Sequence, residues 1–197
     1  MASAFSHVIA AAAIGSVFYR RGLSVRFWVL AAACSIAPDA DVIGVALGVP
    51  FQSLLVHRGL SHSLVFAAAL AAVVVLVFFA RMRMGVSPAR LWLYFFLATA
   101  SHGVLDALTN GGPGIAFFAP FDNARYFLPW RPVVASPIGI RPFFSEWGLR
   151  VIESELLWIW LPSLISAGLV VIVRGRINRG RSGDTASSRV KPRCVRH

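Results

Sequence analysis

Five apolar stretches restrict what this chain can fold into. They cover residues 4–19, 23–37, 63–80, 89–108 and 155–173. A helix needs about 17 to 25 such residues to cross a bilayer, and the last three stretches reach that length. The chain is also 57% hydrophobic and only 14% charged, well below the charged fraction of soluble domains. The sequence therefore predicts an all-α, polytopic transmembrane bundle of about five helices, without room for a separate soluble domain.

The positive charge is concentrated behind the last apolar stretch. Eight of the nineteen basic residues fall between Arg174 and Arg196. We expect residues 1–174 to form the membrane domain and residues 175–197 a basic cytoplasmic tail, disordered after Gly180, that faces anionic lipid headgroups. Nucleic acid is not an expected partner because no aromatic residues interleave with this charge. The sequence predicts no particular oligomeric state.

The charges around the first apolar stretch and the number of cysteines exclude a cleaved signal peptide and a disulfide-rich protein. No basic residue precedes the first apolar stretch, whereas Arg20 and Arg21 follow it. A cleavable signal peptide has the opposite charge order, so we expect this segment to be retained as a helix. The two cysteines, Cys34 and Cys194, are too few for a disulfide framework or a thiolate zinc site.

Basic residues also predict the orientation of the bundle. Arginines cluster around residues 20–26 and 81–90 and in the tail, and the positive-inside rule makes these connections cytoplasmic. The connections 38–62 and 109–154 are then external. The second of these is rich in glycine, proline and aromatic residues, which predicts a long irregular outer loop covering the bundle, with Trp130 and Trp147 at the interface.

Histidines and aspartates stand at the ends of the apolar stretches, and the predicted topology brings seven of them to the outer face. Such groups are costly at membrane depth unless they pair or bind something, so they indicate a functional site. His102 and Asp106 are four residues apart and project from one helix face. The predicted metal ligands are His7, Asp39, Asp41, His57, His62, His102 and Asp106.

The spacing within two motifs suggests distinct roles. Asp39 and Asp41 are separated by one residue, so one could bind an ion while the other orients a ligand, binds a second ion or merely caps a helix. His57 and His62 are expected to straddle a junction between loop and helix, with a bend at Gly59 and an N-cap at Ser61. Arg58 is expected to bind an anionic group bidentately or to reach the interface as a snorkelling side chain.

Imidazoles and carboxylates without thiolates suit a catalytic divalent metal ion, most naturally zinc, with manganese or iron as alternatives. Seven ligands exceed the needs of one ion, so the site could hold one or two. Such ions lower the pKa of a bound water and polarise a phosphoryl or carbonyl oxygen. Asp41 could also take part in catalysis, and Glu146, Glu153 or Asp122 could serve as general base.

Five motifs, in this order and spacing, resemble those of the YdjM-like bacterial inner-membrane proteins, which are described as metal-dependent hydrolases. They are Phe5-Ser6-His7, Pro38-Asp39-Ala40-Asp41, His57-Arg58-Gly59-Leu60-Ser61-His62-Ser63, Ser101-His102-Gly103-Val104-Leu105-Asp106-Ala107-Leu108-Thr109-Asn110 and Pro120-Phe121-Asp122-Asn123-Ala124-Arg125-Tyr126. The resemblance runs from about residue 3 to 173. It implies that the seven residues named above form the metal site and that Arg58 and Arg125 contact the substrate.

The sequence thus predicts a membrane-bound hydrolase of the bacterial inner membrane that acts on a lipid or phosphoester at the outer interface. The first alternative is a transporter for metal ions or protons, which would need titratable groups continuing toward the cytoplasmic end of the helices. The second is a non-catalytic scaffold braced by metal, which would bind an ion without turnover.

Overall fold

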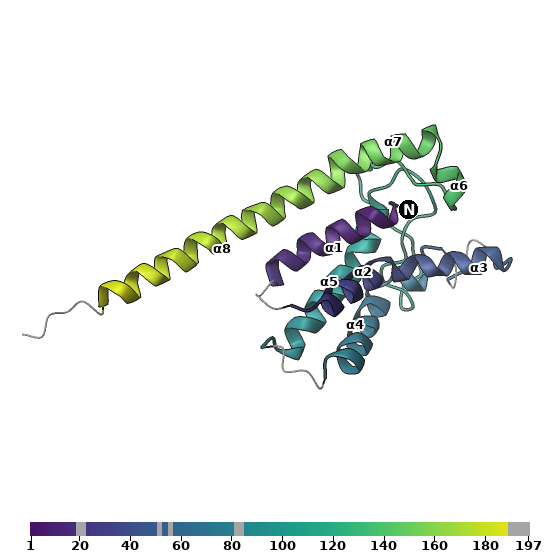
Figure 1. The fold of residues 1–197 in the computed structure, drawn as a ribbon. Coiled ribbons are helices and arrows are strands. Elements are labelled where there is room, and N and C mark those ends of the chain that lie inside the picture. Colours follow the sequence, from purple (N-terminus) through teal and green to yellow (C-terminus); the bar gives the residue numbers. More distant parts are fainter. Residues whose placement is uncertain (19–22, 51–52, 55–56, 81–84, 189–197) are drawn as a thin grey trace, which may run out of the picture.

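The computed structural model describes residues 1–18, 23–50, 53–54, 57–80 and 85–188, and every element in them is helical (Figure 1). Only two isolated β-bridges interrupt this pattern in the described residues. The elements are α1 (Ala4–Phe18), α2 (Val25–Ile36), η1 (Ala37–Asp41), α3 (Val42–Ala46), η2 (Leu60–His62), α4 (Leu64–Phe78), α5 (Pro88–Ala107), α6 (Ile140–Phe143), α7 (Glu146–Glu155), the π-helical turn η3 (Leu156–Trp160) and α8 (Leu161–Ser188).

Each predicted apolar stretch forms a helix. By length and composition, two continuous helical segments are able to cross a membrane, Val25–Val45 and Glu146–Ile177. Two shorter apolar helices, Ala4–Phe18 and Leu64–Phe78, accompany them. The helix starts follow ordinary capping chemistry, since Ser63 and Ser87 accept hydrogen bonds from the backbone of Phe66 and Arg90.

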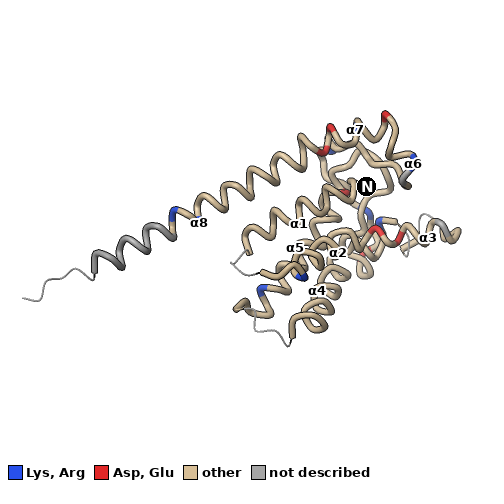
Figure 2. The backbone as a smooth tube through the Cα atoms, in the orientation of Figure 1, with Lys and Arg blue, Asp and Glu red and all other residues tan. Residues whose placement is uncertain are grey.

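Helix α5 is the centre of the packing and contacts α1, α2 and α4. Its half remote from His102 is buried in an aromatic core, where the ring of Tyr94 stacks on Phe27 at 4.6 Å and Phe95 is fully buried. Acidic residues gather instead at the other end of the bundle, beside α3, α6 and α7 (Figure 2). The chain therefore separates an apolar half from a half that carries its carboxylates.

Helix α8 packs along α1 and then leaves the bundle (Figure 1). Its outward residues are apolar and exposed, among them Leu164 at 65% and Leu169 at 57%. Such a bare apolar helix is typical of a surface covered by lipid. The helix continues through residue 188, so the segment expected to be disordered from Gly180 is helical as far as Ser188, and the predicted domain boundary at residue 174 stays a prediction.

The outer connection is less irregular than predicted. Ser145 caps α7 by accepting a hydrogen bond from Trp147 N–H, and ten residues from Glu146 onward are helical because no proline interrupts them. The irregular part is fastened to the end of α5, where Asn110 N–H donates to Val133 O at 2.9 Å. It therefore covers that end of the bundle as a fixed segment.

Glu155 fastens the start of α1 to α7. Its carboxylate is fully buried and accepts hydrogen bonds from Ser3 N–H and Ser3 Oγ, both at 2.5 Å, and from Ser6 Oγ at 2.7 Å. Three donors compensate the cost of burying this charge. Because His7 follows Ser6 directly, this anchor also positions the histidine of α1.

Candidate metal centre

Three segments of the chain bring four ligand groups together at the carboxylate-rich end of the bundle. Asp39 comes from η1 behind α2, His62 from η2 before α4, and His102 and Asp106 from one face of α5. One nitrogen or oxygen of each lies within 4.8 Å of those of the others. Pro38 at the start of η1 ends α2, which places Asp39 at this end.

The spacing of these four atoms suits one ion. The Nε2 atom of His102 lies 3.1 Å from His62 Nε2, 3.3 Å from Asp39 Oδ1 and 4.0 Å from Asp106 Oδ2. His62 Nε2 lies 3.8 Å from Asp39 Oδ1 and 3.7 Å from Asp106 Oδ2. Ligands about 2.0 to 2.1 Å from a tetrahedral zinc ion are about 3.3 Å apart, so small adjustments bring all four into coordination range.

The hydrogen bonds of His62 and His102 assign the same tautomer to both imidazoles. His102 Nδ1 lies 2.8 Å from the carbonyl oxygen of Ser35, and His62 Nδ1 lies 3.2 Å from Asp41 Oδ2. The Ser35 carbonyl and the Asp41 carboxylate only accept hydrogen bonds, and Ser61 Oγ, 3.0 Å from His62 Nδ1, already donates to Asp41. Each Nδ1 therefore carries the proton and each Nε2 presents a lone pair. Two lone pairs 3.1 Å apart repel each other unless a cation or a proton lies between them.

The carboxylates are equally short of partners. Asp39 Oδ1 and Asp106 Oδ2 are buried and accept no hydrogen bond, although the Arg58 guanidinium faces Asp106 Oδ2 with its Nε at 3.5 Å. An unpaired buried carboxylate oxygen costs free energy unless a cation compensates it. The donor set of two imidazoles and two carboxylates therefore fits a divalent metal ion.

Asp41 lies behind His62. Its Oδ2 atom accepts hydrogen bonds from Ser61 Oγ at 2.5 Å and from the Arg58 backbone N–H at 3.2 Å, besides facing His62 Nδ1. Such a carboxylate fixes the tautomer of a metal-binding histidine. Asp41 also forms a second potential metal-binding group with His57 and His62, and His57 Nδ1 lies 3.5 Å from Asp41 Oδ1. Asp39 and Asp41 thus face different nitrogens of His62, Nε2 and Nδ1 respectively.

Of two local predictions for this segment, one was wrong and one is confirmed. The N-cap of α4 is Ser63 and not Ser61, because Ser61 binds Asp41 instead. The predicted bend at Gly59 is present, with φ of −90° and ψ of −133°, and Arg58 before it has a left-handed φ of +68°. The contacts of the Arg58 backbone and side chain stabilise this uncommon conformation.

His7 lies beside the four-residue group and is not a member of it among the described residues. Its ring stacks on His102 at 3.7 Å between centroids, with 14° between the planes. Its Nε2 atom lies 3.6 Å from Asp106 Oδ1, which accepts a hydrogen bond from Ala2 N–H at 2.6 Å. The contact with His102 and Asp106 supports a role in holding these two groups.

Arg58 is fully buried, so the expectation of a snorkelling side chain was wrong. Its guanidinium donates to Gly111 O at 2.6 Å and to Thr109 Oγ1 at 2.8 Å, and its Nε lies 3.5 Å from Asp106 Oδ2. A side chain at Gly112, where φ is +88°, would collide with it. Burial lowers the pKa of the Arg58 guanidinium, and the Asp106 carboxylate opposes that shift. These contacts favour the positioning of Asp106 over the substrate binding expected for Arg58.

The remaining predicted site residues lie outside both groups. Arg125 donates to the backbone carbonyls of Ser53, His57 and Arg58, each at 3.3 Å, and so fastens the loop that carries His57. Glu146, predicted to be catalytic, is exposed in the first turn of α7, where it serves the helix N-terminus.

The two other acidic candidates for a general base are exposed as well, namely Glu153 and Asp122. Hydrogen bonds from Ala124 N–H and the Tyr126 hydroxyl lower the pKa of Asp122. A general base works best with a pKa near the operating pH, so this shift disfavours Asp122.

Sequence reasoning missed the groups that support these ligands. Two of these groups are backbone carbonyls, which have no sequence signal. The Ser35 carbonyl faces His102, and the Gly111 carbonyl accepts a hydrogen bond from Arg58. Thr109 and Glu155 are polar side chains within or next to apolar stretches, and both are fully buried. Their positions at the edges of the apolar stretches 89–108 and 155–173 were the signals that could have identified them.

Comparison with known proteins identifies the family. The model of the family described as YdjM inner membrane protein matches residues 1–178. The chain belongs to the YdjM family. It is 35% identical over 133 residues to the inner membrane protein YbcI of Escherichia coli (strain K12), which covers 68% of this chain and 76% of YbcI. No solved structure matches. Membership of the YdjM family confirms the resemblance seen in the motifs and the inner membrane as its location.

Replacing Asp41 by asparagine is expected to weaken the affinity of the centre for Zn²⁺ about 10- to 100-fold, because the amide no longer fixes the proton on His62 Nδ1 as strongly. Competition with a fluorescent chelator on detergent-solubilised protein measures this change. The exposed Asp122→Asn serves as the matched control with unchanged affinity. Unchanged affinity in Asp41→Asn, or loss of a whole second equivalent of zinc, would contradict the supporting role.

Proposed function

We propose that the protein is a polytopic, metal-dependent hydrolase of the inner membrane that acts on a lipid or a lipid-linked phosphoester. The observation that carries the proposal is the pair of facing Nε2 atoms of His62 and His102, 3.1 Å apart, together with the buried oxygens of Asp39 and Asp106 that accept no hydrogen bond. A divalent cation would compensate the charge and the lone pairs that these four ligand atoms bring together. The membership of the chain in an inner-membrane family supports the location of this chemistry.

Zinc is the ion that we favour, with manganese or iron as alternatives. The nitrogen and oxygen donors suit all three, and the near-tetrahedral spacing suits zinc best. Cys34 is buried in the core cluster of α2, α4 and α5 and takes no part in either group. When bound, a divalent ion supplies an acidified water and polarises the oxygen of a phosphoester or ester.

The residues of the chain would then hold and orient the reactants. Asp39 has the most exposed side chain of the four, at 14%, whereas those of His62, His102 and Asp106 are at 0%. A substrate group would therefore approach from the side of Asp39. Asp41 would keep His62 in the tautomer that binds metal, and Arg58 would keep Asp106 in place.

The lipid substrate follows from the proposed position of the centre in the membrane. The carboxylates gather at one end of the bundle (Figure 2), where they meet the histidine ligands. In the sequence, the arginines of residues 20–26, 81–90 and 174–176 belong to the other connections, which we place in the cytoplasm. The centre would then lie at the depth of the outer headgroups. An enzyme there can reach a headgroup without extracting the lipid.

A non-catalytic scaffold is the second candidate, and one observation favours it. Structural zinc sites have four protein ligands, whereas catalytic sites keep a position open for water, and this group offers four. Transport of ions receives less support, because the described helices are filled below the centre by the aromatic core around Tyr94 and Phe95. That core offers a cation no polar path.

Metal content and turnover together test the proposal. We expect purified protein in detergent to retain about one equivalent of zinc per chain and to release phosphate from phosphatidic acid in mixed micelles. Asp39→Asn should lose both properties, while the exposed Glu146→Gln should keep both. Stoichiometric metal without hydrolysis of any phospholipid or phosphoester in a panel would favour the scaffold, and protein that binds no metal would reject both.

A further inference from the structure

An exposed apolar stripe runs along the helical segment that leads from α2 through η1 into α3, which continue one another in Figure 1. Its members are spaced three or four residues apart, so they lie on one face. The opposite face of α2 is packed in the core through Phe27, Ala31 and Cys34. The α2–α3 stripe consists of Val29, Ala33, Ile36, Ala40, Ile43 and Leu47, and all six are exposed.

The length and composition of the α2–α3 stripe fit contact with lipid. From Val29 to Leu47 the helix rises roughly 27 Å, close to the hydrocarbon thickness of about 30 Å, and Val25–Val45 is one of the two segments able to cross a membrane. No charged residue occurs from position 42 through 56. Contacts between membrane helices favour small residues, whereas four of the six stripe residues are bulky. Lipid is therefore a better occupant than a helix of a second copy.

Asp39 stands at the edge of the α2–α3 stripe. It follows Ile36 by three residues and precedes Ile43 by four, so these two are its neighbours on the helix surface. Of the four ligands in the metal centre, Asp39 is also the one whose side chain is partly exposed, at 14%. The lipid-facing stripe thus borders the ligand that can be reached from outside.

We propose that the metal centre opens sideways into the membrane at Asp39, so that its substrate is a lipid that arrives from the bilayer past Ile36, Ala40 and Ile43. This inference rests on the proposed function and specifies how its lipid reaches the centre. A headgroup at Asp39 would keep its acyl chains in contact with the α2–α3 stripe. The lipid would then react without leaving the hydrocarbon layer with its chains.

The second element beside this opening has the same apolar surroundings. The turn η2, which carries His62, contacts η1. The helix α4 that follows it presents exposed Val65 and Val73. Apolar surface of this kind is compatible with lipid and unfavourable for a charged ester dissolved in water.

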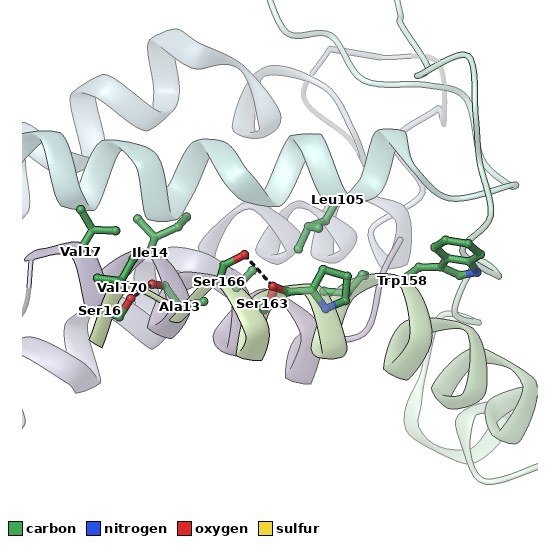
Figure 3. A pocket seen from close by; sticks show the side chains of 12 residues that line it. Ala13, Ile14, Ser16, Val17, Leu105, Trp158, Ser163, Ser166 and Val170 are labelled. Carbon is green, nitrogen blue, oxygen red and sulfur yellow. Dashed lines mark hydrogen bonds between the residues drawn. The ribbon is translucent and has the colours of Figure 1, made fainter. Parts of the chain in front are cut away.

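The groove between α1 and α8 is a poor alternative entrance (Figure 3). It has a volume of about 370 Å³ and is lined, among others, by Ala13, Leu105 and Ser163. None of the residues that line it is a ligand. Its Leu105 is packed against the buried cluster that contains Ile159 and Val133. The partly exposed ligand lies instead on η1.

Spin labels at single cysteines test the opening without any turnover. The zinc-loaded protein is placed in vesicles of phosphatidylethanolamine and phosphatidylglycerol, with Cys194→Ser as background and the buried Cys34 retained. Labels at Ala40→Cys and Ile43→Cys should meet dissolved oxygen as often as a label at Val29→Cys. They should meet a water-soluble nickel chelate roughly fivefold less often than a label at the exposed Asp122→Cys, because the polar chelate stays in water.

Collisions of the nickel chelate with the labels at Ala40→Cys and Ile43→Cys as frequent as with the label at Asp122→Cys would overturn the proposal. Phosphate release from phosphatidic acid together with that result would retain the hydrolysis and place its entrance on the aqueous side. Labels that face lipid in a protein without any phosphate release would retain the opening and reject the hydrolysis.

A blocked entrance tests the route of the substrate. Ala40→Trp beside Asp39 should lower phosphate release from long-chain phosphatidic acid in these vesicles by roughly tenfold, because the headgroup no longer reaches the centre in a productive position. The zinc content should stay unchanged. Val29→Trp, about three turns away on the same stripe, is the matched control and should preserve both properties. Ile43→Trp makes the same test if Ala40→Trp does not fold. Undiminished release in Ala40→Trp and Ile43→Trp would contradict the lateral route.

Discussion

Replacing His102 by alanine is expected to remove the bound metal from the purified protein almost completely. The Nε2 atom of His102 lies within 4.0 Å of the ligand atoms of all three other members of the group, Asp39, His62 and Asp106. Without it two carboxylates and one imidazole remain, and the stacking partner of His7 is lost as well. Elemental analysis of the wild type and the variant, purified in parallel, measures the result.

His57→Ala is the informative control for His102→Ala. His57 belongs only to the second group, with Asp41 and His62, so the variant should keep the first equivalent of metal. Glu146→Gln, which changes an exposed carboxylate outside both groups, should keep all of it. A His102→Ala protein with an undiminished metal content would show that the ion binds elsewhere.

Replacing Arg58 by methionine is expected to destabilise the fold by about 3 to 5 kcal/mol, which lowers the melting temperature by roughly 10 °C. The change leaves the carboxylate of Asp106 and the carbonyl of Gly111 without the guanidinium that faces them in a fully buried site. The cost arises because those groups remain buried and lose their partner. Thermal unfolding in detergent, followed by intrinsic tryptophan fluorescence, measures the change.

Arg125→Met is the matched control for Arg58→Met. Arg125 also loses hydrogen bonds to three carbonyls, but its side chain is only half-buried and faces no carboxylate ligand. We expect a loss of about 1 kcal/mol, which is typical of neutral acceptors that water can reach. Equal melting temperatures for Arg58→Met and the wild type would contradict the positioning of Asp106 by a buried guanidinium.

The helices and the grouping of the ligands could be predicted because both follow from local rules. Apolar stretches of sufficient length specify helices wherever they lie, and the alternation of basic connections places the ends of these helices on one side or the other. The i, i+4 spacing of His102 and Asp106 likewise brings both to one face of α5. These inferences need no knowledge of tertiary contacts.

The separate roles of the site residues could not be predicted, because these roles depend on tertiary contacts. The ring of His7 stacks on His102 and lies outside the four-residue group. No spacing in the sequence predicts a stacked ring. The left-handed backbone at Arg58 turns its guanidinium toward Thr109 and Asp106 and away from the surface. Only its predicted side of the membrane indicated a catalytic role for Glu146, and its helix leaves it exposed.

X-ray absorption spectroscopy at the zinc edge of the purified protein is the most direct measurement, because the central claim is that Asp39, His62, His102 and Asp106 share one ion. We expect a first shell of nitrogen and oxygen alone at about 2.0 to 2.1 Å, with outer-shell scattering from two imidazoles. A sulfur ligand near 2.3 Å, or a shell without imidazole scattering, would contradict it. His102→Ala would then be expected to abolish the signal of one imidazole or the bound zinc itself.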